Sequence, residues 1–444
     1  MLPYLYSMIM RCAMPYLRFV LKRRLKRGKE HPKRYPERMG QFTKKRPQGA
    51  LIWLHGASVG ESLSILPIVS RILTEYPNTH ILVTTGTVTS AKLMEERLPK
   101  QAFHQFIPMD SPLWCQNFLD HWQPDAVIWL ESDFWPNLLM EMKRRDIPAV
   151  LVNARMSERS FRRWKLGGAG FLRHILTGFH FCLAQNEAEQ KRLQYFGHQN
   201  VFVTSNLKYA SDPLPVNKNA KTKLQKIIGA RPVWQFASTH PGEERLAAQI
   251  HQNLSGKIKG LLTVIIPRHL DRGEDVYKEI ANMGLKAIRR SQNQDMTPDV
   301  DIYIADTIGE MGLFFDTIDL VVMGGSFVPH GGHNPIEPAQ FGCAVMYGPH
   351  MFNFKTICHD FETAKAAYAL PGSDALEQKL KSALEAPARV QSIQAAAKRL
   401  TQEKAKAGDE LWSYLGPWIT QSIKKSIDQP RGQEGDKVGS NKVS

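Results

Sequence analysis

Cysteine is scarce in this sequence: its 444 residues include five, and no two of them form a CxxC pair. They are odd in number and widely separated, at Cys12, Cys115, Cys182, Cys343 and Cys358. This distribution argues against a disulfide framework and against a structural zinc site. It is typical of a protein that works in a reducing compartment.

Long uninterrupted apolar runs are also lacking. The most apolar stretch, residues 1–21, is broken by Pro3, Arg11, Pro15 and Arg18. A membrane-spanning helix needs about 20 mainly apolar residues, and an arginine at mid-bilayer costs about 2.5–3.5 kcal/mol. A secretory signal does not fit either, because its positive region should precede the apolar run and a small-residue cleavage site should follow it.

Acidic residues are few at the amino-terminal end. Residues 1–46 contain 14 Lys/Arg and 2 Asp/Glu, a net +12 out of a formal +16 for the whole chain, so the other 398 residues carry +4. This asymmetry argues against a uniformly basic nucleic-acid binder. Such a protein would also need basic residues interleaved with aromatics along its body, so no nucleic acid is expected as a partner.

The basic cluster at 22–29 directly follows the apolar stretch. This pattern predicts a membrane anchor that lies in the bilayer or enters it shallowly, with the cluster facing anionic lipid headgroups. The positive-inside rule then places the body of the protein in the cytoplasm. The alternative is a solvated basic arm.

From about residue 50, short apolar runs alternate with helix-length amphipathic stretches. The alternation predicts βαβ units, and therefore parallel sheets, in two α/β domains of similar size. The expected buried strands are 51–55, 80–85, 126–130, 149–152 and 179–184 in the first half, and 233–238, 261–267, 301–306, 319–325 and 344–348 in the second.

The predicted organisation has six parts. They are a membrane anchor and basic collar (1–46), a first Rossmann-like domain (47–210), a polar lysine-rich linker (211–232), a second Rossmann-like domain (233–400), a helical segment (401–428) and a polar tail expected to be disordered (429–444). Ligands of open α/β sheets bind at the carboxyl ends of the strands, so the polar residues just after strands are the candidate site residues.

Glu61 ends the motif His55-Gly-Ala-Ser-Val-Gly-Glu, which follows the first strand of the body. At the start of a helix beside the site, its carboxylate could accept a proton from a hydroxyl group. Ser58-Val-Gly-Glu61 equally fits the S-x-x-E capping box, in which Glu61 only caps its own helix. The spacing leaves both interpretations open.

The other strands of the first half are also followed by polar residues. Acids after a strand could form a polar site or only stabilise a helix N-terminus. These candidates are Glu131 and Asp133, then Asn153 and Arg155, then Asn206 and Lys208, which follow a further expected strand at 201–205.

In the second half, the segment 238–244 follows a strand and leads into a helix whose backbone N–H groups could hold a phosphate. Arg268, after Pro267, could pair with a phosphate or a carboxylate. The glycine-rich run 324–337 carries more polar residues than a connector needs, and it ends with Asn334 and Glu337. Its two histidines have no third ligand at a suitable spacing, so no metal site is expected.

Nine ordered motifs closely resemble those of the 3-deoxy-D-manno-octulosonic acid (Kdo) transferases of lipopolysaccharide synthesis. They are HGASVGES, VTTGTVTS, ESDFWPNL, VNARMSERS, SNLKY, ASTHPGEE, IPRH, DTIGEMGLFF and GGSFVPHGGHNPIEPA, and the resemblance covers about residues 30–425. It implies a GT-B glycosyltransferase fold, two Rossmann-like domains with the active site in the cleft between them.

The resemblance also implies the reaction. Kdo would pass from CMP-Kdo to a hydroxyl of the lipid A precursor (lipid IVA), at the cytoplasmic face of the cell inner membrane. The reaction would invert the anomeric centre and need no metal or other cofactor. The base would lie in the first half of the chain and the CMP-binding residues in the second. The active site would therefore assemble when the two domains close.

The resemblance also implies roles for the residues that match the motifs of the family. Glu61 resembles the family's general base, and Glu131 and Lys208 resemble its transition-state stabilisers. The expected CMP-binding residues are Pro267, Arg268, Ile308, Gly309, Glu310, Asn334, Pro335, Ile336 and Glu337.

Two departures from the family pattern stand out. Asp133 lies in Glu-Ser-Asp-Phe-Trp-Pro, where the family usually has Glu-Thr-Glu-Leu-Trp-Pro, so the role of this second acid stays open. Ala210 replaces the acid that usually follows the family lysine, whereas Lys208 itself is kept.

Two other functions remain as alternatives. One is a GT-B enzyme that uses a UDP-sugar, which nucleotide protection against thermal unfolding would distinguish. The other is a membrane-tethered nucleotide-sugar binding protein without turnover.

Overall fold

The computed structural model describes residues 2–294 and 296–428. Contacts divide the chain into two compact units: the first contains the residues up to Ser211 and those from Lys406 onward, and the second contains Asp212–Ala405. The boundary therefore lies at the start of the predicted linker 211–232. The predicted disordered tail, 429–444, lies outside the described residues.

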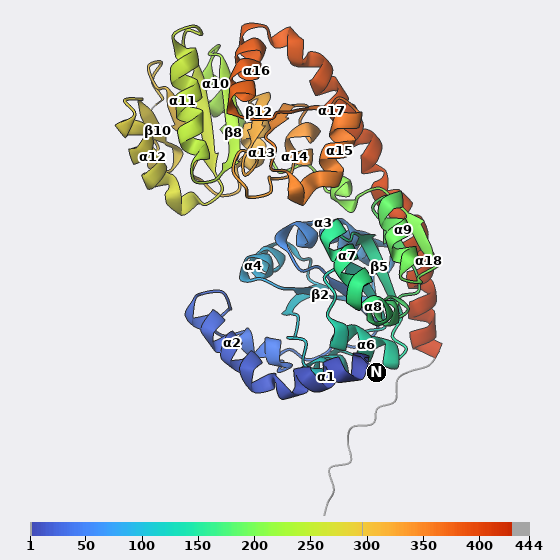
Figure 1. Cartoon of the computed structure of the whole chain (residues 1–444). Coiled ribbons are helices and arrows are strands. Elements are labelled where there is room, and N and C mark those ends of the chain that lie inside the picture. The colour runs from blue at the N-terminus through green and yellow to red at the C-terminus, as the bar shows by residue number, and fades with distance from the viewer. Residues whose placement is uncertain (1, 295, 429–444) are drawn as a thin grey trace, which may run out of the picture. The chain divides into compact units, whose positions relative to one another are not determined.

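The first unit is built on a seven-stranded parallel sheet (Figure 1). Its strands have the order β3-β2-β1-β4-β5-β6-β7. They are β1 (Leu51–His55), β2 (His80–Thr85), β3 (Ala102–Phe106), β4 (Ala126–Leu130), β5 (Ala149–Ala154), β6 (Cys182–Ala184) and β7 (Val201–Val203). The strand order reverses between β1 and β4, which is where open α/β sheets bind their ligands.

Side chains of successive strand residues point to opposite faces of this sheet, so each strand supplies two cores. Leu51 and Trp53 pack on one face, under α5 (Pro112–Trp122), α6 (Pro136–Arg144), α8 (Ala169–Leu176) and α9 (Glu187–Tyr195). Ile52 and Leu54 pack on the other, under α3 (Val59–Glu75), α4 (Val88–Arg97) and α18 (Ala407–Asp428). The apolar strands are buried on both faces, which is why they read as continuous hydrophobic runs.

The second unit repeats this architecture with the strand order β10-β11-β9-β8-β12-β13-β14. Its strands are β8 (Val233–Thr239), β9 (Leu262–Pro267), β10 (Ala287–Arg289), β11 (Ile302–Ile304), β12 (Leu320–Met323), β13 (Ala344–Tyr347) and β14 (Ala367–Ala369). Its helices are α10 (Lys218–Ile228), α11 (Glu243–Ser255), α12 (Gly273–Asn282), α13 (Met311–Phe315), α14 (Ile336–Gln340), α15 (Lys355–Thr363), α16 (Ser373–Glu385) and α17 (Gln391–Ala405). Here the strand order reverses between β8 and β12.

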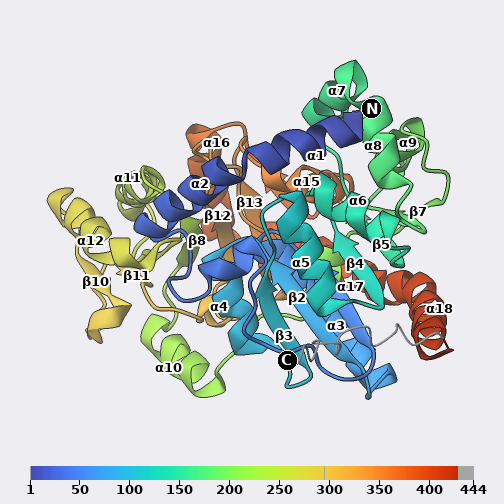
Figure 2. The same ribbon diagram turned by 90° about the horizontal axis from the view of Figure 1, so that it is seen from below.

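The amino-terminal segment folds onto the first unit. Helices α1 (Leu2–Cys12) and α2 (Met14–Lys26) run along its surface (Figure 2). Tyr6 Oη donates a hydrogen bond to Asp110 Oδ2 over 2.8 Å, and Leu17 and Leu21 pack with Trp114. Among residues 2–294 and 296–428, no helix combines the length and apolar character that a membrane span requires.

Candidate active site

Glu61 lies in the first turn of α3, and its carboxylate caps that helix. Ser58 Oγ accepts a hydrogen bond from the backbone N–H of Glu61 over 3.3 Å and donates one to Glu61 Oε1 over 2.7 Å. The backbone N–H of Ala57 donates to Glu61 Oε2 over 2.8 Å. The capping interpretation therefore describes the local structure well, with the carboxylate reaching one residue further back than in the usual capping box.

The same carboxyl group also has the electrostatics of an acid–base residue. Glu61 is 8% exposed, and burial, together with the charges of Glu131 and Asp133, raises its pKa from 4.5 to about 7. The bonds from Ser58 and Ala57 act in the opposite direction and are outweighed. A carboxyl group that titrates near neutrality is suited to proton transfer.

Glu131 follows β4, at the other side of the point where the strand order reverses. Its carboxylate forms an ion pair with Lys208, with 3.3 Å between Lys208 Nζ and Glu131 Oε1. Glu131 itself adopts a left-handed backbone conformation with φ of 55°, which is uncommon for a non-glycine residue and is frequent at functional sites. The structure thus brings together the three residues predicted to be catalytic: Glu131 contacts Lys208, and its charge acts on Glu61.

Buried amides hold this pair in place. Asn153, near the end of β5, also has a left-handed backbone (φ 55°). Its Nδ2 approaches Glu131 Oε1 at 3.5 Å, and its Oδ1 accepts the backbone N–H of Leu207 over 3.1 Å. Gln185 Nε2 donates to the backbone oxygen of Asn153 over 3.0 Å, and Gln185 Oε1 accepts from Asn206 Nδ2 over 3.1 Å. The sequence interpretation missed Gln185; its position directly after strand β6 was the available signal.

Asn206 completes the network. Its Oδ1 accepts the backbone N–H of Lys208 over 3.0 Å, so it caps the short 3₁₀ turn η2 (Leu207–Ala210). Through these amides, residues at the ends of β5 and β6 fix the backbone that carries Lys208.

A second chain of bonds reaches Glu61 from the amino-terminal segment. Buried Arg38 donates to the backbone oxygens of Gly86 and Ile107, and it pairs with Glu30 over 3.2 Å. The N–H of Gly86 donates to the backbone oxygen of Ala57 over 3.2 Å. A Cβ at Gly86 would lie 3.0 Å from that oxygen, so the approach favours glycine here. The sequence interpretation did not single out Arg38.

In the second unit, the buried carboxylate of Glu243 accepts hydrogen bonds from backbone N–H groups near the point where the strand order reverses. Its carboxylate accepts the N–H groups of His240, Gly325, Ser326 and Phe327 at 2.7–3.1 Å. The sequence prediction that N–H groups of segment 238–244 could hold a phosphate is therefore wrong for His240, because the N–H of that residue already serves a carboxylate of the protein.

Six of the predicted CMP-binding positions are Glu337 itself and residues of the two segments 267–268 and 334–336. Burial raises the pKa of this carboxyl group, while the hydrogen bond from Asn334 Nδ2 (3.2 Å to Oε1) and the charge of Arg268 lower it. Asn334 Oδ1 also accepts the N–H of Ile336 over 3.2 Å. The Arg268 side chain is exposed, immediately after Pro267 at the end of β9. Pro335 and Ile336 are buried and contribute to packing.

The remaining predicted CMP-binding positions lie in the loop before α13. Ile308 is 81% exposed, and Gly309 has a positive φ of 78°. Glu310 is held by Arg290 through two contacts of 2.6 Å, and these bonds lower the pKa of Glu310. Sequence reasoning missed Arg290, which directly follows β10, a short strand that it did not predict.

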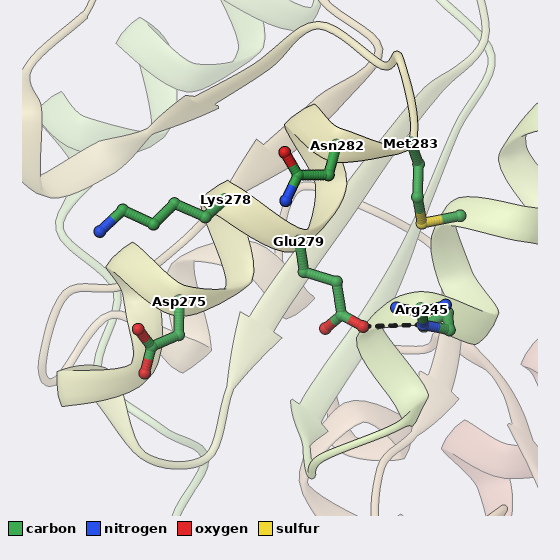
Figure 3. A pocket seen from close by; sticks show the side chains of 6 residues that line it. All are labelled: Arg245, Asp275, Lys278, Glu279, Asn282 and Met283. Carbon is green, nitrogen blue, oxygen red and sulfur yellow. Dashed lines mark hydrogen bonds and ion pairs between the residues drawn. The ribbon is translucent and has the colours of Figure 1, made fainter.

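Among the residues that the structure describes, no group of three or more His, Cys, Asp and Glu side chains is arranged to hold a metal ion. A surface depression between α11 and α12 (Figure 3) contains none of the predicted site residues and is partly filled by an ion pair between Arg245 and Glu279. It is lined by Arg245, Asp275, Lys278, Glu279, Asn282 and Met283.

Comparison with known proteins identifies the family. Residues 33–211 match the profile of 3-deoxy-D-manno-octulosonic-acid transferases. A 3-deoxy-D-manno-octulosonic acid transferase from Rickettsia bellii is 35% identical over 381 residues, which cover 86% of this chain and 90% of the relative. The chain belongs to the Kdo transferase family. A 3-deoxy-D-manno-octulosonic acid transferase from Haemophilus influenzae supports the same assignment. It is 31% identical, and the match covers 85% of this chain and 88% of the relative.

Solved structures place this Kdo transferase family member in the GT-B fold class. A glycosyltransferase from Rickettsia africae superposes with a TM-score of 0.56, covering 85% of this chain and all of its own, at 14% sequence identity. At that identity the likeness concerns the fold alone. The predicted fold class and the resemblance noted in the sequence are both confirmed, and the enzyme class is that of a glycosyltransferase.

The titration of Glu61 in this Kdo transferase yields a prediction. Its folded pKa lies above its ordinary value, so the native state holds a proton that the unfolded chain has lost between about pH 4.5 and 7. Stability should therefore fall as pH rises through this range, relative to Glu61→Gln. Chemical unfolding of both proteins across this range measures the difference.

Glu131→Gln supplies the companion test. Removing the Glu131 charge should lower the pKa of Glu61, so the pH-dependent difference should move to lower pH. An unchanged midpoint would mean that Glu131 does not act on Glu61.

Proposed function

We propose that this chain is an inverting glycosyltransferase that moves Kdo from CMP-Kdo to a hydroxyl of the lipid A precursor (lipid IVA) in lipopolysaccharide core biosynthesis. The observation that carries the proposal is Glu61, a buried carboxyl with a pKa of about 7 beside the Glu131–Lys208 pair. Family membership supports the donor sugar.

In the proposed reaction, the Glu61 carboxylate takes the proton of the acceptor hydroxyl. The hydroxyl oxygen forms a bond to the anomeric carbon of Kdo, while the bond from that carbon to the phosphate oxygen of CMP breaks. Attack in line with the departing CMP inverts the anomeric centre. Both capping donors, Ala57 N–H and Ser58 Oγ, orient the carboxylate for this step.

Lys208 and Glu131 would stabilise the charges that develop during transfer. Kdo is itself a carboxylate, and the amide network fixes the backbone that carries Lys208, so little reorganisation is needed to present its ammonium group. The ion pair with Glu131 keeps that ammonium group in one place in the absence of substrate.

CMP leaves with one phosphate, whose charge a side chain can offset without a divalent ion. Arg268, exposed at the end of β9, supplies a guanidinium group for this purpose. Glu337, close enough to sense the charge of Arg268, would accept hydrogen bonds from ribose hydroxyls.

The proposed location is the cytoplasmic face of the cell inner membrane, with α1 and α2 as the anchor. These helices expose apolar side chains while their opposite side packs on the first unit. The exposed residues are Leu2, Tyr4, Leu5, Met8, Ile9, Tyr16 and Phe19. The basic residues that follow on α2 suit an anionic lipid surface.

The deciding experiment is incubation of the protein with CMP-Kdo and lipid IVA, with the product mass read directly. A mass increase by whole Kdo units is expected. Transfer from a UDP-sugar instead, or binding of CMP-Kdo without any product, would favour one of the two alternatives.

Glu61→Gln separates proton transfer from helix capping. Glutamine can still accept a capping bond but cannot take a proton, so the variant should melt near the wild-type temperature and bind CMP normally. Its transfer rate should fall at least about 100-fold. Ser58→Ala is the matched control: it removes a cap and should cost about 0.5–2 kcal/mol of stability. A Glu61→Gln enzyme with most of its activity would leave only the capping role.

Nucleotide binding makes a further prediction. CMP should bind in the presence of EDTA, more tightly than UMP or UDP, in a calorimetric titration. Arg268→Ala and Glu337→Ala should each weaken it by about 1.5–3 kcal/mol, the value of a charged hydrogen bond. Arg245→Ala, which removes a cation from the depression in Figure 3, should leave affinity unchanged. Binding that requires added Mg²⁺ would contradict the proposal.

Membrane attachment is tested with replacements of exposed side chains. Replacing Tyr4, Met8 and Phe19 by serine should reduce binding to anionic vesicles without unfolding the protein, because none of them is buried. Raising the salt concentration should weaken binding further. The control triple replaces Phe202, Ile227 and Phe352, which are also exposed. Equal losses in both triples would argue against an anchor at α1 and α2.

A further inference from the structure

Helix α7 (Glu158–Gly167) has an unusual outward face. Arg159, Arg162, Arg163 and Leu166 have the i, i+3, i+4, i+7 spacing of a single helix face, and all four are exposed. Leu166 is 89% exposed, more than any other large apolar residue among those described. The opposite face holds Phe161 and Trp164, which pack into the first unit.

The only acidic residue of α7 lies near its start and is already paired. Glu158 is paired with Arg162 over 2.9 Å and with Arg192 over 2.7 Å. The outward face therefore presents a net positive charge around an apolar side chain. An apolar side chain among basic residues is the composition of helices that lie in the headgroup region of a membrane.

The packed face of α7 is connected to α1 through aromatic side chains. Tyr6 of α1 packs against Phe171 of α8 with ring centroids 5.5 Å apart, and Phe171 packs against Trp164 of α7 at 6.2 Å. Helix α8 therefore lies between α7 and the amino-terminal end of α1 (Figure 1). On α7 itself, Lys165 Nζ lies 5.3 Å from the ring centroid of Tyr195 of α9, which is half exposed.

Most exposed large apolar side chains belong to a few helices of the first unit. Of the fourteen among the described residues, seven lie on α1 and α2, and Leu166 and Tyr195 raise the total to nine. A concentration of this kind marks an interaction surface more often than scattered exposure does.

We propose that α7 is a second membrane-contacting element, which lays Arg159, Arg162, Arg163 and Leu166 onto the same anionic lipid surface as α1. The inference rests on the proposed membrane attachment and extends it to a helix far along the chain. Since α7 begins four residues after the end of β5, whose Asn153 contacts Glu131, this contact would hold the carboxyl edge of the sheet next to the lipid surface in which the proposed acceptor lies.

A fluorescent probe at position 166 tests the contact directly. Cys12 is the only exposed cysteine within the described residues, so the full chain carries Cys12→Ser, then Leu166→Cys, and is labelled with an environment-sensitive dye. Adding phosphatidylglycerol/phosphatidylcholine vesicles should shift its emission to the blue. The matched control is Ile227→Cys on α10, a helix that also carries several lysines, and its emission should not shift.

Partitioning between buffer and vesicles measures how much the basic residues of α7 contribute to binding. The triple Arg159→Gln, Arg162→Gln, Arg163→Gln should weaken binding about 100-fold, since each basic residue near an anionic surface contributes about fivefold. The control triple Lys218→Gln, Lys223→Gln, Lys226→Gln on α10 removes the same charge and should have little effect. Equal losses would show that net charge alone governs binding, and would overturn the proposal.

Two outcomes separate this surface from the proposed function. A blue shift at position 166 without any Kdo transfer would reject the reaction and keep the surface. Transfer with no shift at position 166 would reject the surface. A shift that requires lipid IVA in the vesicles, and is absent with phosphatidylglycerol alone, would assign α7 to the proposed acceptor and also overturn the lipid contact.

Discussion

The hydrogen bond from the backbone of Ala57 to the carboxylate of Glu61 is the contact on which the first unit's site depends. It fixes the carboxylate at the start of α3, where the strand order reverses and a ligand can reach it. Capping and proton transfer are therefore compatible roles. The capping bonds lower the pKa of Glu61, yet burial and the nearby acids outweigh them and bring it to about 7. The cap sets the direction of the carboxylate, and its surroundings set its proton affinity.

That contact is connected to the amino-terminal segment through a continuous series of bonds. Arg24 of α2 pairs with Glu30 over 2.7 Å, Glu30 pairs with Arg38, and Arg38 holds Gly86, whose N–H binds Ala57. Removing the whole segment 1–46 would therefore disturb the candidate site as well as any membrane contact. For this reason, replacements of exposed side chains on α1 report on attachment more cleanly than truncation does.

The sequence predicted the strands that are buried on both faces, because their apolar runs are continuous. It missed β3, β10 and β14. β3 contains His104 and Gln105, two polar residues whose burial depends on tertiary partners such as Thr85. β10 and β14 are short and are not buried throughout: β10 ends in the half-buried Arg289, and no residue of β14 is fully buried. The linker 211–232 was expected from its lysines and prolines, but its Leu224 and Ile228, four residues apart, form the buried stripe of α10.

The candidate site also contains residues that the sequence predicted and residues that it missed. Local motifs pointed to Glu61, Glu131 and Lys208, because each follows a strand and the carboxyl ends of parallel strands share an edge. The residues that hold them, Gln185 and Arg38, act over long sequence separations and have no motif of their own. The raised pKa of Glu61 was equally out of reach, since it depends on burial and on an acid 70 residues away.

Glu243 limits which groups of the second unit are available to bind a phosphate. Four backbone N–H groups converge on its carboxylate, and displacing it would leave a buried charge without its donors, which is strongly unfavourable. A phosphate therefore cannot use these donors while the loop keeps this structure. The positive charge for a leaving phosphate must come from side chains, and Arg268 is exposed next to the same strand reversal. In this unit the backbone donors hold the glycine-rich loop in shape, so under the proposed function the charge of the leaving phosphate would be met by a side chain such as Arg268.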